Sequence, residues 1–359
     1  MTAPTNQQVL EALSQIHDPD LGRDVVSLGF VKDLAIDPEG RVSFTFELTT
    51  PACPVRDRFK TQAQDAVGAI PGVTAVDVRM TANVRPAFIR PKPSEVMPGV
   101  KQTIAVASGK GGVGKSTVAV NLAAALRKAG AEVGLLDADI LGPSVPAMTG
   151  SRTTPANANG RIVPIEAHGL KVISFGHVRP PGEVTVFRGP MVGKMIEELM
   201  RLTEWGRLDY LVIDLPPGTG DASLTLAQAI PLTGVAIVCT PQDVATDIAV
   251  NALQMFRKLN VTPLGLIENM SWYVCPSCGH RHEIFSHGGA EAAAQRFNVP
   301  FLGAIPLEEG IREDADSGTP VVISRPESAG AKAFVEIASQ VAARTSIQSF
   351  RQLPVINVH

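Results

Sequence analysis

A glycine-rich loop between a predicted strand and a predicted helix constrains this chain more than any other feature. The apolar run TIAVAS at 103–108 predicts a buried strand, and the pattern over 115–129 predicts a helix. The joining segment GKGGVGKST matches GxxxxGK(S/T), and its glycines allow successive backbone N–H groups to face phosphate oxygens. A flexible glycine-rich turn would not require that flanking strand and helix. The sequence therefore predicts a nucleotide phosphate site made by Gly109, Lys110, Gly111, Gly112, Val113, Gly114, Lys115, Ser116 and Thr117.

Three side chains of this loop have separate expected roles. Lys115 is expected to reach the β- and γ-phosphates of ATP, and Ser116 to place its hydroxyl on Mg²⁺. Lys110 occupies a position that the ordinary motif leaves free, and KGGVGKST resembles the deviant Walker A loop of the MinD, ParA and nitrogenase-iron-protein class. In that class the first lysine contacts nucleotide across a dimer interface. The resemblance implies a face-to-face homodimer with Lys110 in its catalytic set, whereas a solvated loop lysine is the alternative.

The rest of the chain from Gln102 alternates short apolar runs with helical patterns. Near-continuous apolar strands separated by helices predict an α/β fold, with a mostly parallel sheet covered by helices on both faces. The segment at 161–176 is expected to add an antiparallel pair. Further strands are expected in EVGLLD, LDYLVIDL, GVAIVCT, PLGLIEN and PFLGAIP, and helices near 190–203, 222–230, 244–259, 288–297 and 327–344.

Carboxylates follow two of the predicted strands. Asp137 and Asp139 end one strand and Asp214 ends another, which places them at the ligand crevice of an open α/β sheet. Asp214 matches a Walker B acid that holds Mg²⁺, and Gly218 can offer a backbone N–H to the γ-phosphate. By resemblance to the deviant Walker class, Asp139 would position the attacking water. Asn269 would face the adenine, with an ordinary turn asparagine as the alternative. Asp137 is expected to support Mg²⁺, although helix capping is an equal alternative.

The N-terminal residues 1–82 predict a separate small α+β domain. A helical pattern carrying Val9 to Ile16 precedes two alternating runs, FVKDLAID and RVSFTFEL, which read as a hairpin. A helix near 55–69 and the strand VTAVDVRM follow. Four prolines in 83–100 favour an extended linker, so the nucleotide-binding domain is expected over 101–350 and a C-terminal tail over 351–359.

A close cysteine pair, Cys275-x-x-Cys278, indicates metal or redox chemistry. A structural zinc could use both thiols with His280 and His282, although that spacing is tighter than in the usual finger. A redox disulfide would instead follow a strand and open a helix. A [4Fe–4S] cluster usually takes four thiolates, which two protomers related by a two-fold axis would supply together. The dimer implied by Lys110 would provide that arrangement.

The two remaining cysteines differ in setting. Cys239 ends the apolar run GVAIVCT and is expected to be a buried small hydrophobe. Cys53 lies in a Pro-bracketed loop before a predicted helix, whose N-terminus can lower a thiol pKa. Cys53 could therefore ligate or receive iron, with a plain loop cysteine as the alternative.

Together these motifs carry a family resemblance over nearly the whole chain. GKGGVGKST, DADILGPS, VIDLPPGTGD and ENMSWYVCPSCG resemble the Mrp/ApbC group of iron–sulfur cluster carrier ATPases. The segment IHDPDLGRDVVSLGFVKDL with LTTPACP resembles the small iron–sulfur-assembly-associated domain that precedes the ATPase in bacterial Mrp proteins. The resemblance implies ATP hydrolysis coupled to binding of a [4Fe–4S] cluster by Cys275 and Cys278. It also implies cluster scaffold proteins and apo iron–sulfur proteins as partners.

Composition and charge bear on the rival functions. The net charge of −3 and the 5% aromatic content do not favour a nucleic-acid partner. A DNA-partitioning ParA-like ATPase would need such a partner. The C-terminal SIQSFRQLPVINVH does not resemble the amphipathic anchor of a membrane-cycling MinD-like ATPase. Such a spatial ATPase with a structural zinc remains the alternative. No secretory signal is visible and the cysteines are few, so the sequence predicts a cytoplasmic protein without membrane partners.

Overall fold

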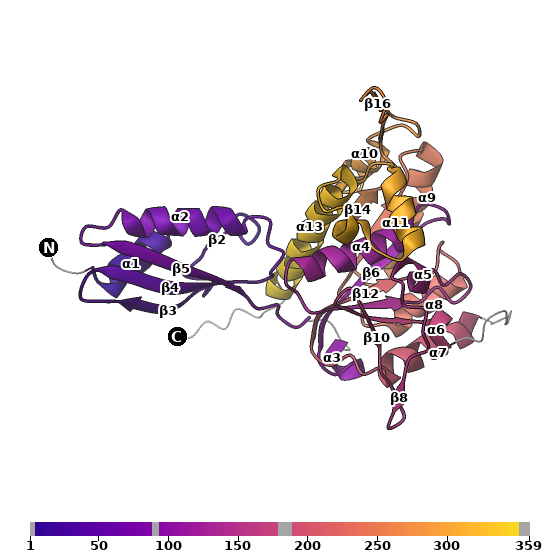
Figure 1. The fold of residues 1–359 in the computed structure, drawn as a ribbon, viewed down its shortest axis with the longest axis horizontal. Helices are drawn as coiled ribbons and strands as arrows, with labels where there is room; N and C mark the ends of the chain where they lie inside the picture. Colours follow the sequence, from indigo (N-terminus) through magenta and orange to yellow (C-terminus); the bar gives the residue numbers. More distant parts are fainter. Residues whose placement is uncertain (1–3, 88–92, 179–188, 352–359) are drawn as a thin grey trace.

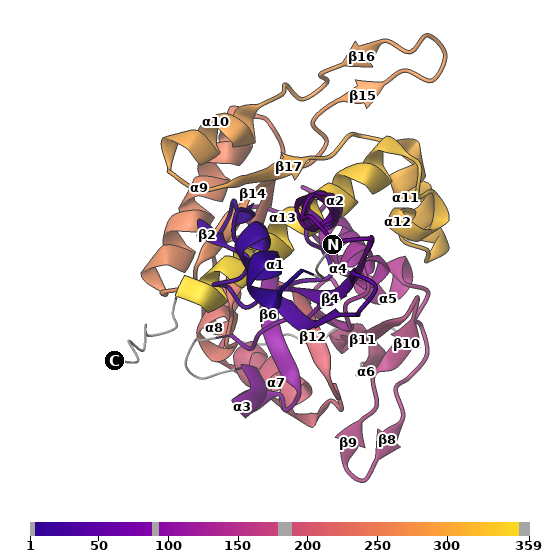
Figure 2. The ribbon, with the colours of Figure 1, turned by 90° about the vertical axis from the view of Figure 1, so that its left-hand side faces the viewer.

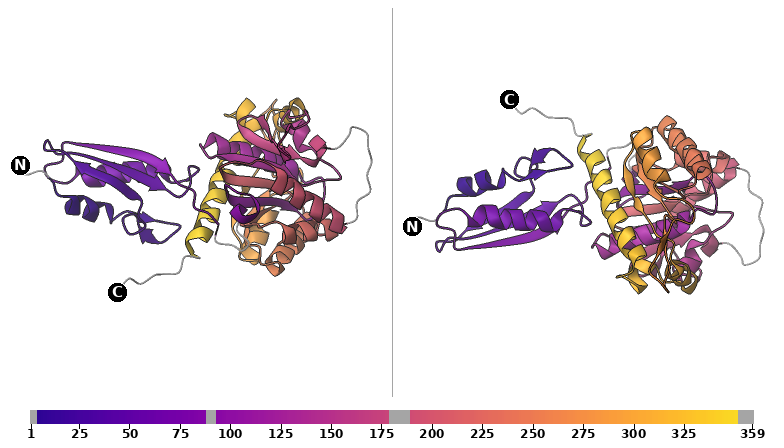
Figure 3. Two further views of the ribbon diagram at one scale, coloured as in Figure 1. Left: turned by 90° about the horizontal axis from the view of Figure 1, so that it is seen from below. Right: turned by 90° about the horizontal axis from the view of Figure 1, so that it is seen from above.

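The computed structural model describes residues 4–87, 93–178 and 189–351 of the 359-residue chain. Two main sheets organise it, one of three strands in the N-terminal part and one of eight strands in the remainder. Each part has hydrophobic clusters of its own. Figures 1 and 3 show the smaller part to one side, with helix α13 (Ala329–Arg351) on the side of the larger part that faces it.

The larger sheet has the strand order β10-β11-β7-β12-β6-β13-β14-β17. Every neighbouring pair is parallel except β10 and β11, which form the expected antiparallel pair. The strands are β6 (Val100–Ser108), β7 (Val133–Asp137), β10 (Ile165–Ala167), β11 (Leu170–Ser174), β12 (Leu208–Asp214), β13 (Gly234–Cys239), β14 (Pro263–Glu268) and β17 (Phe301–Ala304).

Helices cover both faces of this sheet, because alternate residues of each apolar strand enter different cores. Val106 and Leu135 pack with α4, α12 and α13, whereas Ala105 and Leu136 pack with α7, α8, α9 and α10 on the other face. The predicted fold class is therefore confirmed. The helices are α3 (Pro93–Val96), α4 (Lys115–Lys128), α5 (Val145–Met148), α6 (Phe175–Val178), α7 (Gly189–Leu202), α8 (Asp221–Ala229), α9 (Asp243–Lys258), α10 (Gly289–Arg296), α11 (Glu309–Ser317) and α12 (Val321–Ser324).

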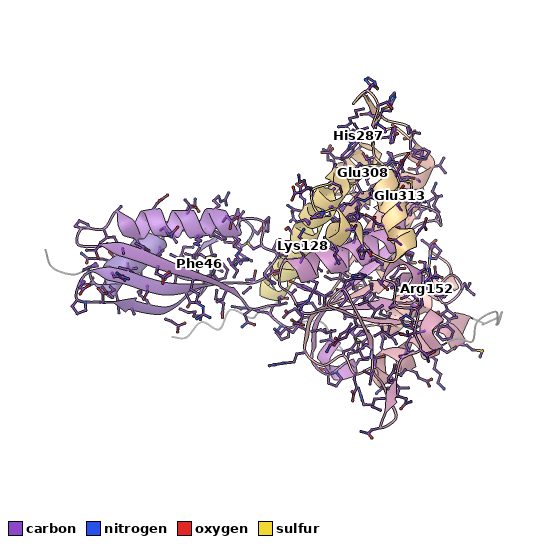
Figure 4. All side chains as sticks on the ribbon, in the orientation of Figure 1. Phe46, Lys128, Arg152, His287, Glu308 and Glu313 are labelled. Carbon is purple, nitrogen blue, oxygen red and sulfur yellow. The ribbon has the colours of Figure 1, made fainter. Side chains whose placement is uncertain are left out.

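The smaller part packs two helices against a three-stranded sheet of order β3-β4-β5. Phe46 lies at the centre of its core (Figure 4). Its ring stacks on that of Phe59, with ring centroids 5.5 Å apart. The expected hairpin joins β3 and β4, whereas β5 runs parallel to β4, because α2 carries the chain across the sheet between them. Its elements are α1 (Asn6–Leu13), β1 (His17–Asp18), β2 (Arg23–Asp24), β3 (Val31–Ile36), β4 (Arg41–Leu48), α2 (Arg56–Gly68) and β5 (Ala75–Ala82).

The segment expected as an extended linker is partly packed and partly helical. Residues 93–96 form helix α3, and Met97 is buried against the larger part, because apolar residues among the prolines reach its core. The Tyr210 hydroxyl also donates to Thr50 Oγ1 over 3.0 Å, which joins the two parts directly. Helix α13 continues beyond the expected residue 344 to Arg351, whereas most of the predicted tail, at 352–359, lies outside the described residues.

Two small hairpins project from the larger part. Strands β8 (Asn157–Ala158) and β9 (Arg161–Ile162) form one, and β15 (Tyr273–Val274) and β16 (Arg281–His282) form the other. In Figure 2 the β15–β16 hairpin stands clear of the body of the molecule. Among the described residues, no helix has both the length and the apolar character needed to cross a membrane.

Candidate functional site

The glycine-rich loop joins β6 to α4, as the sequence predicts. Helix α4 begins at Lys115, and its N-cap Gly114 has a φ of 80°, a left-handed conformation that favours glycine. A Cβ at Gly109 would lie 2.5 Å from the Ile248 carbonyl oxygen, so the close approach of α9 also requires glycine there. Beside the loop lies a cavity of about 220 Å³, lined by Ser108, Lys110, Gly111, Gly112, Gly114, Lys115, Ser116, Thr117, Asp139, Ser144, Met148 and Pro217.

At the floor of this loop Lys115 forms an ion pair with Asp214. The Lys115 Nζ lies 2.5 Å from Asp214 Oδ1, and the two side chains are 6% and 0% exposed. The second oxygen of Asp214 is buried and has no hydrogen-bond partner. Burial raises the pKa of Asp214, and Lys115 opposes that shift. An orphaned carboxylate oxygen beside Ser116 fits a Mg²⁺ site, because Mg²⁺ prefers such oxygen ligands.

Asp137 is placed beside Asp214 by the parallel pairing of β7 and β12. Both of its oxygens accept hydrogen bonds within the protein. Oδ1 accepts from the Asp139 N–H over 3.1 Å, and Oδ2 from the Val145 N–H over 3.2 Å and from the Ser174 hydroxyl over 3.0 Å. Burial, followed by the Asp214 charge, raises the pKa of Asp137 to about 7. In this structure Asp137 organises the loop after β7.

Asp139 and Lys110 both line the cavity, as their expected roles require. Asp139 Oδ1 accepts from the Gly142 N–H over 3.2 Å. Gly218 does not present its N–H to the cavity, because that N–H donates to the Ser108 carbonyl over 2.9 Å. A contact from Gly218 to a γ-phosphate would therefore require the loop after β12 to rearrange.

Asn269 follows β14 and is buried behind the glycine-rich loop. Its Nδ2 donates to the Val113 carbonyl over 2.8 Å, and it lies against Gly114. The side chain therefore supports the loop backbone in this structure. A contact with adenine remains a prediction.

The cysteine pair lies at the turn of the β15–β16 hairpin. Cys278 is exposed and Cys275 is half-buried. The Cys275 N–H donates to the His280 carbonyl over 2.9 Å, which closes the hairpin. Hydrogen bonds from the Ser277 and Cys278 N–H groups lower the pKa of the Cys275 thiol. These backbone donors favour the thiolate form of Cys275.

His280 and His282 do not complete a metal site with the two thiols. Their rings pack edge-to-face 4.6 Å apart, as alternating strand neighbours do. Within the described parts of the chain, no three His, Cys, Asp or Glu side chains are grouped so that they could hold a metal ion. The four side chains of the alternative zinc site are therefore not grouped together in this structure.

The structure agrees with the prediction for Cys239 and differs from that for Cys53. Cys239 is 1% exposed, and burial raises the pKa of its thiol to about 12, so the expected buried hydrophobe is confirmed. The expectation of a lowered pKa at Cys53 is wrong. Burial raises the pKa of that thiol to about 11, and the nearby Asp18 and Asp20 charges add to the shift.

A hydrogen-bonded cluster at the end of β14 was not expected from sequence. The fully buried Glu268 carboxylate accepts from the Gly288 and Ala290 N–H groups over 2.9 and 2.8 Å and from the Ser271 hydroxyl. His287 contacts the same hydroxyl and lies near the foot of the hairpin (Figure 4). The Gly288 and Ala290 N–H groups lie 20 and 22 residues beyond Glu268, so no local pattern could have found the whole cluster.

The fold and the glycine-rich loop define a nucleotide-binding P-loop NTPase of the MinD/ParA-like class. Solved structures of that class are similar to this chain. A nucleotide-binding protein of Archaeoglobus fulgidus in complex with ADP is 36% identical, with a TM-score of 0.58 over 66% of this chain and 93% of its own. The septum site-determining protein MinD of Pyrococcus horikoshii, complexed with Mg-ADP, is 25% identical, with a TM-score of 0.51 over 67% and 95%.

Family models and whole-chain relatives show which family within the P-loop NTPase class this chain belongs to. Residues 99–342 match the model of the NUBPL iron-transfer P-loop NTPases, and residues 6–78 match that of an iron–sulfur cluster assembly protein. The iron–sulfur cluster carrier protein of Deinococcus radiodurans is 44% identical over 97% of this chain and 98% of its own length. That of Escherichia coli is 46% identical over 80% and 78%. The chain belongs to the NUBPL iron-transfer P-loop NTPase family, which confirms the resemblance to the Mrp/ApbC carriers.

Proposed function

We propose that this protein binds a [4Fe–4S] cluster between two subunits and transfers it to apo-proteins, with ATP binding and hydrolysis at the glycine-rich loops. The observation that carries the proposal is the position of Cys275 and Cys278. They lie at the exposed turn of a hairpin that follows β14 directly, on the same domain as the nucleotide cavity. The names of the whole-chain relatives support a carrier role.

The chemistry of the cargo accounts for the two-subunit arrangement. A [4Fe–4S] cluster takes four thiolates, and each subunit has two on its hairpin. A two-fold axis through paired hairpins would bring four together. A cluster held at this hairpin turn, where Cys278 is exposed, would be accessible to the cysteines of a scaffold or apo-protein, as transfer requires.

The nucleotide site supports hydrolysis through its own side chains. Lys115 would bind the β- and γ-phosphates, and Asp139, which also lines the cavity, would orient the attacking water. Ser116 and Asp214 would hold Mg²⁺, which neutralises phosphate charge when bound, and Asp137 would support them. Asn269, which supports the loop backbone through Val113, would also contact the adenine base of the bound nucleotide.

Two apolar side chains support a face-to-face homodimer. Leu141 is 75% exposed two residues beyond Asp139, and Val244 is 69% exposed in the first turn of α9. Both follow strands whose carboxyl ends form the nucleotide edge of the sheet. Large apolar side chains exposed beside a ligand site are typical of an interaction surface. In such a dimer Lys110 would reach the partner's nucleotide. The protein would work in a reducing compartment such as the cytoplasm, where the cysteines stay reduced.

Anaerobic reconstitution tests this proposal. We expect about one four-iron cluster per dimer, by iron and acid-labile sulfide analysis together with the oligomeric mass in solution. Cys275→Ala should abolish cluster binding, whereas Cys239→Ala, at a buried thiol away from the hairpin, should retain it. Strictly monomeric protein with a full cluster, or Cys275→Ala protein that keeps its iron and sulfide, would refute the shared site.

Nucleotide turnover is tested separately. Lys115→Ala and Asp139→Ala should lose most ATPase activity and still assemble the cluster, because the thiols lie on a separate hairpin. Unchanged turnover in both variants would show that these side chains do not carry hydrolysis.

A further inference from the structure

Residues 268–272, which we call the connector, join the end of β14 to the first strand of the cysteine hairpin. Near one end, the Asn269 amide donates to Val113 of the glycine-rich loop over 2.8 Å. At the other end, the Trp272 ring contacts Arg281 of the hairpin. The connector therefore touches both the nucleotide loop and the element that carries the thiols.

The connector has a defined backbone conformation. The Ser271 N–H donates to the Ile305 carbonyl over 2.9 Å, and the Leu307 N–H donates to the Trp272 carbonyl over 2.7 Å. Met270, immediately before Ser271, has a φ of 57°, in the left-handed region that non-glycine residues rarely adopt. Such a conformation persists only where its surroundings impose it, so the connector is held firmly on both sides.

The buried carboxylate of Glu268 links the connector to the start of α10. Glu268 accepts the Gly288 and Ala290 N–H groups at the start of α10 and also the Ser271 hydroxyl. His287 Nδ1 contacts that hydroxyl and lies 3.4 Å from Glu268 Oε1. The His287 ring is therefore fixed next to the connector.

Trp272 lies between this anchor and the hairpin. Its ring meets the His287 ring edge-on, with centroids 6.0 Å apart and an interplanar angle of 87°. The Arg281 guanidinium lies 4.7 Å from the Trp272 centroid, within cation–π range. Arg281 pairs with Val274 across the hairpin, so the indole contacts the hairpin through one of its own strand residues.

The hairpin is small and its turn is exposed. Each of its strands is two residues long, and a hairpin of that size is not stable by itself. Val274 is 48% exposed, and Cys278 at the turn is exposed. The contact between Trp272 and Arg281 is therefore positioned to set the direction of the thiols relative to the domain.

We propose that Trp272 is a positioning residue that couples the nucleotide loop to the cysteine pair. A change at Val113 on nucleotide binding moves Asn269 and the connector, and Trp272 passes this movement through Arg281 to the hairpin. The inference rests on the proposed function, since it assigns to these residues the means by which nucleotide alters access to the cluster.

The rate of iron release from the cluster-loaded dimer tests this coupling. Release to a chelator is measured with and without a non-hydrolysable ATP analogue and Mg²⁺. We expect the analogue to change the rate in the unaltered protein. In Trp272→Ala and Arg281→Ala the ratio of the two rates should move toward one by about two- to fivefold. Trp272→Phe keeps a ring face for Arg281 and should restore most of the ratio.

A matched control comes from a second arginine–aromatic contact. Arg296, the last residue of α10, lies 4.9 Å from the ring of Phe297, which follows the helix, away from the connector. Arg296→Ala removes the same kind of contact and should leave the ratio unchanged. An unchanged ratio in Trp272→Ala, or an equal loss in Arg296→Ala, would overturn the proposal. A merely structural Trp272 would lower cluster content and leave the ratio intact.

Fluorescence quenching of the cluster-free protein separates this inference from the proposed function. The chain has two tryptophans, and Trp205 is only 2% exposed, so acrylamide quenching reports mainly on Trp272. We expect the ATP analogue to alter this quenching, and Ser271→Ala to weaken the effect without loss of nucleotide binding. Unaltered quenching on nucleotide binding would refute the coupling. Protein that never retains a cluster, yet shows altered quenching, would refute only the carrier function.

Discussion

Replacing Asp214 by asparagine tests the energetics of the buried ion pair. Asp214 is fully buried, and Lys115 is 6% exposed with its Nζ 2.5 Å from the carboxylate. Asp214→Asn would leave the ammonium buried without its partner, and breaking such a pair costs about 3–5 kcal/mol. The neighbouring Asp137 carboxylate can ionise in compensation, which favours the lower end of that range, about 3 kcal/mol.

Calorimetry of the nucleotide-free protein is the appropriate assay, because it can resolve separate unfolding transitions for the two parts of the chain. For a unit of this size we expect Tm of the larger part to fall by about 6–12 °C. The control is Asp209→Asn, which breaks the Lys101–Asp209 pair, whose side chains are 35% and 19% exposed. Because solvent screens that pair, its loss should cost about 1 kcal/mol or less.

The double variant Lys115→Met with Asp214→Asn provides a further check. Removing both charges removes the unpaired group, so the double variant should be more stable than Asp214→Asn alone. A Tm loss in Asp214→Asn no larger than that in Asp209→Asn would refute the reasoning. Equal instability of the single and double variants would also refute it.

Three further predictions follow from burial. Folding raises the pKa of Asp137 from 3.8 to about 7. Between these pH values the folded protein keeps a proton on Asp137, whereas the unfolded chain releases it. Nucleotide-free protein should therefore lose stability as pH rises between these values, and Asp137→Asn should flatten the dependence of Tm on pH. Cys53, with a pKa raised to about 11, should react with iodoacetamide far more slowly than Cys275 at pH 7.5, as peptide mass spectrometry would show; equal rates would contradict its burial. Gly109→Ala should reduce ATP affinity in calorimetric titration, because its Cβ would meet the Ile248 carbonyl at 2.5 Å; unchanged affinity would mean that α9 yields freely.

Local patterns were sufficient to predict much of the fold. Each strand of the larger sheet except β10 and β11 is an apolar run bounded by turn residues, and each long helix has a periodic apolar face, so both are readable in single segments. The glycine-rich loop is equally local, since its backbone conformation depends on glycines close together in sequence. Short helices such as α5 and α12 were missed, because their formation depends on packing against α4.

The chemistry of individual groups was harder to predict. Cys53 was expected to have a lowered pKa from its place before a helix, yet burial against the small core raises that pKa. Gly218 was expected to offer its N–H to phosphate, yet Ser108 accepts that N–H. In both cases the deciding partner comes from another element, and a spacing pattern contains no information about burial.

By itself, the order of residues determined the nucleotide loop, the alternation of strands and helices, and the presence of two thiols at metal-binding spacing. These properties depend on neighbours along the chain. Only the tertiary structure decided that Lys115 pairs with Asp214 and that Trp272 lies between His287 and Arg281. Such contacts join distant segments, and their strength depends on the exclusion of water, which only the packed fold provides.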